Sequence, residues 1–140
     1  MNATTKNIVM YVGFILLFIV TYYILTSVEN YDRSLNPKLD EIKDMTIKVH
    51  PGITNIELYE DDKSYTINKE KIYLCLKDKK GQFYSNNMLV YVFLHEYAHT
   101  LCNEVGHTDK FKRIFDELLE KATALGIYNP SIPIINDYCE

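Results

Sequence analysis

An uninterrupted apolar run near the amino terminus restricts the fold of this chain more than any other feature. Residues 8–25 read IVMYVGFILLFIVTYYIL, and three further uncharged residues follow before Glu29 ends the run. A helix of this length rises about 30 Å, which is enough to cross the hydrocarbon core of a bilayer. We therefore predict a short tail over residues 1–7 and a transmembrane helix over residues 8–28, which makes the chain a single-pass membrane protein.

Two other kinds of segment carry apolar runs, a cleavable signal peptide and a buried core helix. A signal peptide has an apolar stretch of about 7–15 residues followed by a small-residue cleavage site. Here the run is longer, and no Ala-x-Ala-like site follows it. A helix without a polar face needs a large protein around it, whereas 140 residues form one compact domain. Basic residues flank the run on both sides, so its orientation in the membrane is not predicted.

The charge distribution argues against a nucleic-acid-binding protein, and the cysteine spacing argues against a disulfide framework or a Cys-x-x-Cys zinc site. The formal net charge is −4, and the basic residues alternate with acids, whereas phosphate recognition normally needs a basic patch. We therefore expect no nucleic-acid partner. Cys75, Cys102 and Cys139 are odd in number and widely spaced, which fits neither a disulfide framework nor a Cys-x-x-Cys zinc site. We expect Cys75 and Cys102 to be small buried residues, although one pair of cysteines could bridge in an oxidising compartment.

The segment after the apolar run changes from polar to strand-like. Residues 29–43 are polar and contain Asn36-Pro37, which indicates a linker with a short helix from Pro37. A folded domain is then predicted over residues 44–140. Its first part contains β-branched and aromatic residues between turn signals, and the predicted strands cover residues 46–49, 53–59, 64–68 and 71–76.

The apolar period becomes helical after Gly81. A first helix is predicted over about residues 87–102, capped by Ser85 or Asn86 and apolar around most of its circumference. A second helix is predicted from Thr108 to Leu125, with Gly126 in the left-handed conformation after it. The predicted fold class is therefore α+β, with a sheet followed by two packed helices.

Five residues of the first predicted helix carry the strongest chemical signal. His95 and His99 are four residues apart, so their side chains lie on one helix face, where both imidazoles can bind one zinc ion at about 2 Å. Zinc lowers the pKa of a bound water to about 7, and Glu96 can take the proton of that water as a general base. The pattern His-Glu-x-x-His on a helix is typical of zinc peptidases. Without a metal, two imidazoles and a carboxylate would be costly to bury on so apolar a helix.

A catalytic zinc needs a third protein ligand, and the sequence offers several candidates. His107 follows Gly106, whose backbone freedom would allow the chain to fold back toward the metal. His50 lies in a turn before the strands and is expected to be a surface residue. Glu117 and Glu120 lie on the charged side of the second helix, which is usually a solvated face. We prefer His107, with an acid on the second helix as the alternative.

The stretch HEYAHTLCNEVGHTDKFKRIFDELL, which begins at His95, resembles the WLM and SprT-like group of minimal zinc peptidases. In that group a third histidine and a phenylalanine four residues on follow the zinc-binding helix, and His107 and Phe111 fit this pattern. The resemblance covers about the last half of the chain. It implies a small antiparallel sheet followed by two helices, one Zn2+ per chain, Glu96 as general base, and peptide hydrolysis with the substrate along a sheet edge.

These observations predict a membrane-anchored zinc endopeptidase that acts on a protein or peptide substrate. His95, His99 and His107 would bind the zinc, and Glu96 would activate the attacking water. Small anchored proteins of this type also resemble ones encoded by large DNA viruses, which would place the chain in a host or viral membrane. Well-known relatives act on protein crosslinked to DNA, a role that does not transfer to an acidic, anchored chain. One alternative is a non-catalytic membrane-anchored binding or assembly protein with a structural zinc site, in which Glu96 would have no role. A simpler alternative is a membrane protein without a metal.

Overall fold

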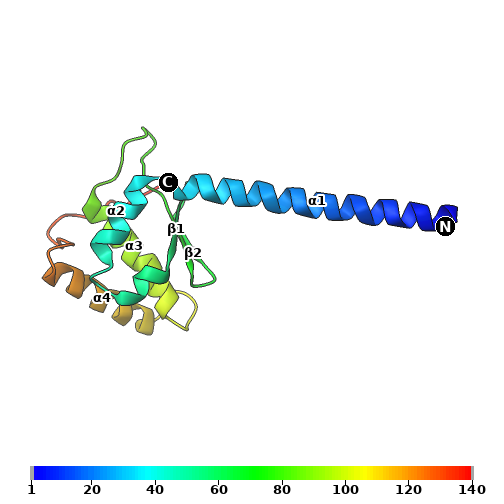
Figure 1. Ribbon diagram of the computed structural model, residues 1–140. Helices are drawn as coiled ribbons and strands as arrows, with labels where there is room; N and C mark the ends of the chain where they lie inside the picture. The colour runs from blue at the N-terminus through cyan, green and yellow to red at the C-terminus, as the bar shows by residue number, and fades with distance from the viewer. Residues whose placement is uncertain (1, 140) are drawn as a thin grey trace. The chain divides into compact units, whose positions relative to one another are not determined.

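The computed structural model describes residues 2–139, apart from the side chains of Asn30, Asp32 and Arg33 (Figure 1). The chain divides into two compact units, residues 1–33 and residues 34–140. The elements follow in the order α1 (Ala3–Ser34), α2 (Pro37–Thr46), η1 (Pro51–Asn55), β1 (Glu57–Glu60), β2 (Tyr65–Ile67), β3 (Lys71–Leu74), α3 (Asn86–Leu101) and α4 (Asp109–Ala124). This order confirms the predicted α+β fold, with a long apolar helix, a small sheet and two packed helices.

The first unit consists of α1, a helix of 32 residues that extends beyond the apolar run at both ends. The side chain of Asn2 accepts the backbone N–H of Thr5 at 2.9 Å and so caps the helix. Residues 3–7, predicted as a tail, are therefore helical. The stretch Ala3–Glu29 is long and apolar enough to cross a membrane, a property that signal sequences share.

The second unit begins with α2, in a segment predicted from the sequence to be a linker with a short helix. Pro37 occupies the first turn, and the side chain of Asn36 accepts the backbone N–H of Lys38 at 3.0 Å. Leu39 and Ile42 are buried in the core of this unit. The folded unit therefore begins about ten residues before the predicted boundary at residue 44, because the short helix from Pro37 presents an apolar face to the core.

Residues 46–49 do not form the predicted strand. The hydroxyl of Thr46 donates to the carbonyl of Ile42 at 2.7 Å, four residues back, as side chains at the end of a helix do. Val49 then closes a turn by donating its N–H to the carbonyl of Thr46 at 2.8 Å, and its side chain is buried. The apolar alternation of this segment thus comes from a helix end and a turn that pack against the core.

The sheet has three strands in the order β1-β3-β2. β2 and β3 form an antiparallel hairpin in which Tyr65 pairs with Tyr73, and the chain reverses at Asn68 and Lys69, which both have positive φ. β1 pairs with β3 in parallel, so the prediction of an antiparallel sheet is wrong for this pair. Patterns within single strands do not encode strand order, and here β3 lies between β1 and β2 although it follows both in sequence.

The two C-terminal helices match their predictions closely. Ser85 caps α3 by accepting the N–H of Met88 at 3.2 Å, and Thr108 caps α4 by accepting the N–H of Phe111 at 3.3 Å. Gly126 has φ of +71°, the left-handed conformation expected after a helix. α3 contacts the sheet as well as α2 and α4, so its nearly continuous apolar circumference is buried from several sides (Figure 1).

A disulfide between Cys75 and Cys139 joins the end of β3 to the C-terminal tail, across a Cα–Cα distance of 6.3 Å. Cys75 is buried as expected, but it is paired, which is the alternative that the sequence left open for one pair of cysteines, whereas Cys102 is free and buried. Beside the disulfide, the hydroxyl of Tyr138 lies 3.0 Å from Ser64 Oγ and also bonds to the carbonyl of Cys75. The Cys75–Cys139 pairing was not predictable, because the two cysteines are 64 residues apart in sequence and meet only when the C-terminal tail packs beside β3.

Candidate metal centre

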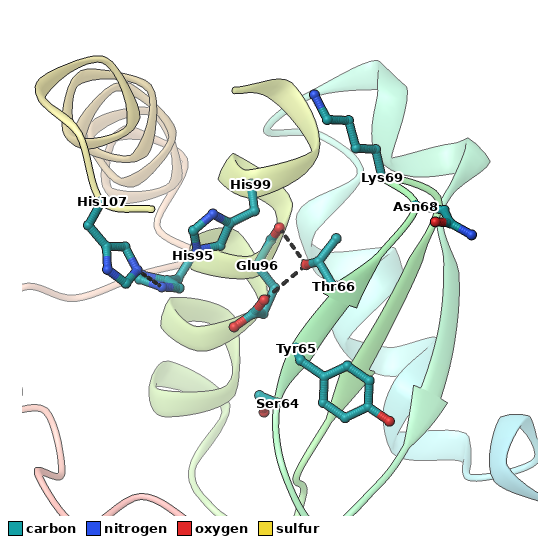
Figure 2. A pocket seen from close by; sticks show the side chains of 9 residues that line it. All are labelled: Ser64, Tyr65, Thr66, Asn68, Lys69, His95, Glu96, His99 and His107. Carbon is teal, nitrogen blue, oxygen red and sulfur yellow. Dashed lines mark hydrogen bonds between the residues drawn. The ribbon is translucent and has the colours of Figure 1, made fainter. Parts of the chain in front are cut away.

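Three histidines come together at the carboxyl end of α3 (Figure 2). His95 and His99 extend from one face of α3, and His107 comes from the loop between α3 and α4. Each imidazole offers one ring nitrogen as a potential ligand atom, and these three nitrogens lie within 4.8 Å of one another. The Nε2 atoms of His95 and His107 are 3.0 Å apart. His107, the third histidine preferred from the sequence, therefore lies beside His95 and His99.

The other candidate ligands take different roles. Glu117 and Glu120 are both exposed on α4 and do not belong to the histidine cluster. The Nδ1 atom of His50 lies 2.6 Å from the hydroxyl of Tyr97 and accepts the N–H of Gly52 at 3.1 Å. His50 is therefore a half-buried residue that caps η1 rather than the surface residue that was expected.

The loop that carries His107 is tied to its surroundings at several points. α3 ends at Leu101, and Cys102 turns the backbone to an extended conformation. Lys69 Nζ donates to the carbonyl of Cys102 at 2.9 Å, and Lys110 Nζ donates to the side chain of Asn103 at 2.7 Å. Gly106 has φ of +83°, a conformation that other residues rarely adopt. These contacts return the chain toward α3 just before His107.

Phe111 packs against all three imidazoles from the side of α4. Its ring centroid lies 5.0 Å from that of His95, 4.2 Å from that of His99 and 4.9 Å from that of His107. Phe111 is almost completely buried, and Phe115, one turn later, contacts His95 at 5.2 Å. These aromatic contacts restrict the ring orientations of the histidines. Phe111 therefore helps to hold the imidazoles in place.

Burial favours the neutral form of both histidines on α3. Burial, together with the charges that His99 and His107 would carry, lowers the pKa of His95 to about 4. Burial and His107 also lower the pKa of His99. A neutral imidazole is the form that binds a metal ion, so the apolar setting of the cluster favours metal binding over protonation.

Glu96 lies beside the cluster and is buried, with 8% of its surface exposed. Its carboxylate atom Oε2 lies 2.9 Å from the hydroxyl of Thr66 on β2. Burial raises the pKa of Glu96, and the hydrogen bond from Thr66 opposes this effect. Figure 2 shows the carboxylate between α3 and β2, on the same side of α3 as the histidines.

A pocket of about 440 Å3 opens over these groups, and its lining combines α3, the loop and the β2–β3 hairpin (Figure 2). The lining residues are Ser64, Tyr65, Thr66, Asn68, Lys69, His95, Glu96, His99 and His107. No sequence motif indicated the residues of β2 and the hairpin turn as part of the site. Strand alternation could have indicated that Ser64 and Thr66 share a face, but only the packing shows that this face meets Glu96.

The cluster fits a tetrahedral zinc ion by its donor set and its spacing. Two ligands of one tetrahedral zinc, each about 2 Å from the metal, lie about 3.3 Å from each other. The observed 3.0 Å between His95 and His107, and the 4.8 Å limit on the whole set, are within small side-chain movements of this spacing. Imidazoles also suit other transition metals, so the geometry defines a three-histidine group that could hold a metal ion without identifying the metal.

The fold and this cluster together define the chain as an α+β protein with a three-histidine group able to hold a metal ion. No protein-family model matches the chain, and no solved structure matches it. It is 50% identical over 90 residues to uncharacterized protein 136R of invertebrate iridescent virus 6, which covers 62% of this chain and 51% of the relative.

Two further relatives extend this homology. The chain is 41% identical over 102 residues to uncharacterized protein 042R of invertebrate iridescent virus 3, covering 72% of this chain and 61% of the relative. It is 38% identical over 111 residues to uncharacterized protein R325 of Acanthamoeba polyphaga mimivirus, covering 74% and 56%. The chain is therefore homologous to uncharacterized proteins of large DNA viruses and spans between half and two thirds of their length.

Proposed function

We propose that this protein is a membrane-anchored, zinc-dependent endopeptidase. The observation that carries the proposal is the set of three imidazoles with ligand atoms within 4.8 Å, in a pocket that also contains the buried carboxylate of Glu96. Three protein ligands leave the fourth position of a tetrahedral zinc free, which is the arrangement of catalytic rather than structural sites. A carboxylate beside that position is the group that peptide hydrolysis requires.

The proposed chemistry divides between the metal and the chain. Zinc, when bound, supplies a Lewis acid that polarises a peptide carbonyl and acidifies a water molecule. Glu96 would accept the proton of the attacking water on a carboxylate oxygen and deliver it to the leaving amine. His95, His99 and His107 would hold the metal through one nitrogen each. β2 is the edge strand of the described sheet on the side of the pocket, so an extended peptide substrate would lie along it.

The resemblance to the WLM and SprT-like peptidases supports the same conclusion. The residues that carry it are His95, Glu96, His99, His107 and Phe111, and they form one contiguous cluster in the fold. The third histidine and the phenylalanine are 12 and 16 residues after the first histidine, so their proximity is a property of the tertiary structure. A chance sequence match would not be expected to assemble in this way.

The remaining parts of the proposal concern the setting of the enzyme. The apolar stretch Ala3–Glu29 would anchor the protein in a membrane by a single helix, in a host or viral membrane, as the viral relatives suggest. The substrate would be a protein or peptide. No nucleic-acid partner is proposed, because the chain carries a net charge of −4.

Metal analysis tests the first half of the proposal. Full-length protein purified in detergent should contain one zinc per chain, and His107→Ala should weaken zinc binding far more than the matched control Glu117→Ala, because His107 belongs to the cluster and Glu117 does not. Zinc content near zero in the wild-type protein would refute the proposal. Stronger weakening by Glu117→Ala would move the third ligand to α4.

Peptide cleavage tests the second half. Wild-type protein should cleave members of a proteome-derived peptide library, detected by mass spectrometry, and Glu96→Gln should retain zinc but lose this cleavage. The substitution removes the general base without removing a ligand. Full zinc content without cleavage by the wild-type protein would favour the alternative of a binding or assembly protein with a structural zinc. Cleavage that survives in Glu96→Gln would refute the mechanism.

A further inference from the structure

The hydroxyl of Thr66 is the side-chain group that contacts the carboxylate of Glu96 within the described part of the chain. Thr66 Oγ1 lies 2.9 Å from Glu96 Oε2 and also 2.9 Å from the backbone carbonyl oxygen of Glu96 (Figure 2). One side chain thus holds both the main chain and the functional end of the same glutamate. The two contacts join the edge strand β2 to α3 in the wall of the pocket, which both residues line.

The chemistry of a hydroxyl suits this double contact. A hydroxyl has a single hydrogen and can both donate and accept. Thr66 can therefore donate to Glu96 Oε2 or to the backbone carbonyl oxygen of Glu96 by rotation about its Cβ–Oγ1 bond. This hydrogen is shared between the two oxygens or donated to one of them at a time, and both lie 2.9 Å from Oγ1.

The position of Thr66 is fixed by the sheet. Thr66 pairs with Ile72 in the antiparallel β2–β3 register, and Ile72 is completely buried. A β-branched residue has a restricted χ1 angle in a strand, so the hydroxyl has little freedom to leave its place. Figure 2 shows Tyr65 directed away from the histidines, whereas Thr66 is directed toward Glu96, as strand alternation requires.

Glu96 needs such a partner because its side chain has three rotatable bonds and is buried beside the histidine cluster. A general base must be held within hydrogen-bond reach of the proton it takes, and displacement of about 1 Å can lower the rate about 100-fold. We propose that Thr66 is the positioning residue of Glu96, which holds the carboxylate in its working orientation. This inference rests on the proposed peptidase function.

Activity measurements on full-length protein test the positioning role. Thr66→Val keeps the shape and β-branching but removes the hydroxyl, so kcat on a peptide identified in the library should fall about 10- to 100-fold, with zinc content unchanged and KM within about threefold. Thr66→Ser should restore most of the rate. The control is Thr100→Val, which removes a hydroxyl bonded to the Tyr97 carbonyl outside the pocket and should leave kcat unchanged. Wild-type kcat in Thr66→Val, or equal losses in Thr66→Val and Thr66→Ser, would overturn the proposal.

A double-mutant cycle on melting temperature separates this inference from the proposed function, because it needs no substrate. In EDTA-treated protein, Thr66→Val should lower Tm by about 5 °C, since it leaves a buried carboxylate without its partner. In a Glu96→Ala background the same substitution should lower Tm by less than half as much. Equal shifts in both backgrounds would overturn the proposal. If wild-type protein cleaves no peptide, the proposed function fails, and the cycle alone decides whether Thr66 holds Glu96.

Discussion

Removal of the Cys75–Cys139 disulfide should destabilise the folded unit by a magnitude that follows from the chain length it closes. The two cysteines are 64 residues apart, and a cross-link over a loop of this size lowers the entropy of the unfolded chain by an amount worth about 4 kcal/mol at 25 °C. Cys139→Ser should therefore lower the free energy of unfolding by about 4 kcal/mol. Cys75→Ala should lose at least as much, because the buried Cys75 also fills space in the core.

Urea unfolding of full-length protein in detergent, followed by the near-ultraviolet circular dichroism of tyrosine, measures this loss. Reductant should shift the wild-type midpoint to that of Cys139→Ser and should not shift the variant further. The control is Cys102→Ala, which removes the free buried thiol and should leave the sensitivity to reductant intact. Thiol titration of the denatured wild-type protein should find one free thiol. Three free thiols would contradict the disulfide, and one free thiol with a loss below about 1 kcal/mol would refute the loop-entropy reasoning.

Three further predictions concern the core and the histidine cluster. Phe111→Ala should lower the free energy of unfolding by about 3–5 kcal/mol and weaken zinc binding in a competition assay with a chromophoric chelator, because its ring contacts three imidazoles. Leu118→Ala, two turns further along α4 and also buried, should destabilise the protein without weakening zinc binding; equal weakening would deny Phe111 a specific role. Tyr97→Phe should cost about 1 kcal/mol in urea unfolding, because it removes the 2.6 Å contact with His50, and no loss would show that this bond is unimportant. In metal-free protein, stability should fall as the pH drops from about 6.5 toward 4, because the unfolded chain binds protons that the folded His95, with pKa about 4, does not yet bind. The raised pKa of Glu96 has the opposite effect on stability. The measurement is therefore the free energy of unfolding against pH in the wild-type protein compared with His95→Ala, whose curve should be flatter. Identical slopes would contradict the lowered pKa of His95.

Features that depend on neighbours along the chain were predictable from the sequence. The apolar run predicts the long helix α1, because a continuous apolar helix can be recognised from residues that are neighbours in the sequence. Ser85, Thr108 and Gly126 cap α3 and α4 where the capping rules place them. The spacing of His95 and His99 puts both imidazoles on one face, since residues four apart on a helix are neighbours.

Features that depend on segments far apart in sequence required the tertiary structure. The parallel pairing of β1 with β3 and the return of the tail to Cys75 follow from packing around a shared core, and no local pattern distinguishes them from their alternatives. The same holds for the contact of Thr66 with Glu96, which joins residues 30 positions apart.

His107 lies between these two cases. The sequence alone made it the preferred third histidine, because Gly106 allows the chain to reverse and the charged face of α4 disfavours the glutamates. Its proximity to His95 depends on the loop contacts made by Lys69 and Lys110 and on the packing of Phe111. The sequence by itself thus determined which residue types could hold a metal, because their spacing is local. The tertiary structure decided that three of them meet beside a buried carboxylate, because only packing brings separate segments within bonding distance.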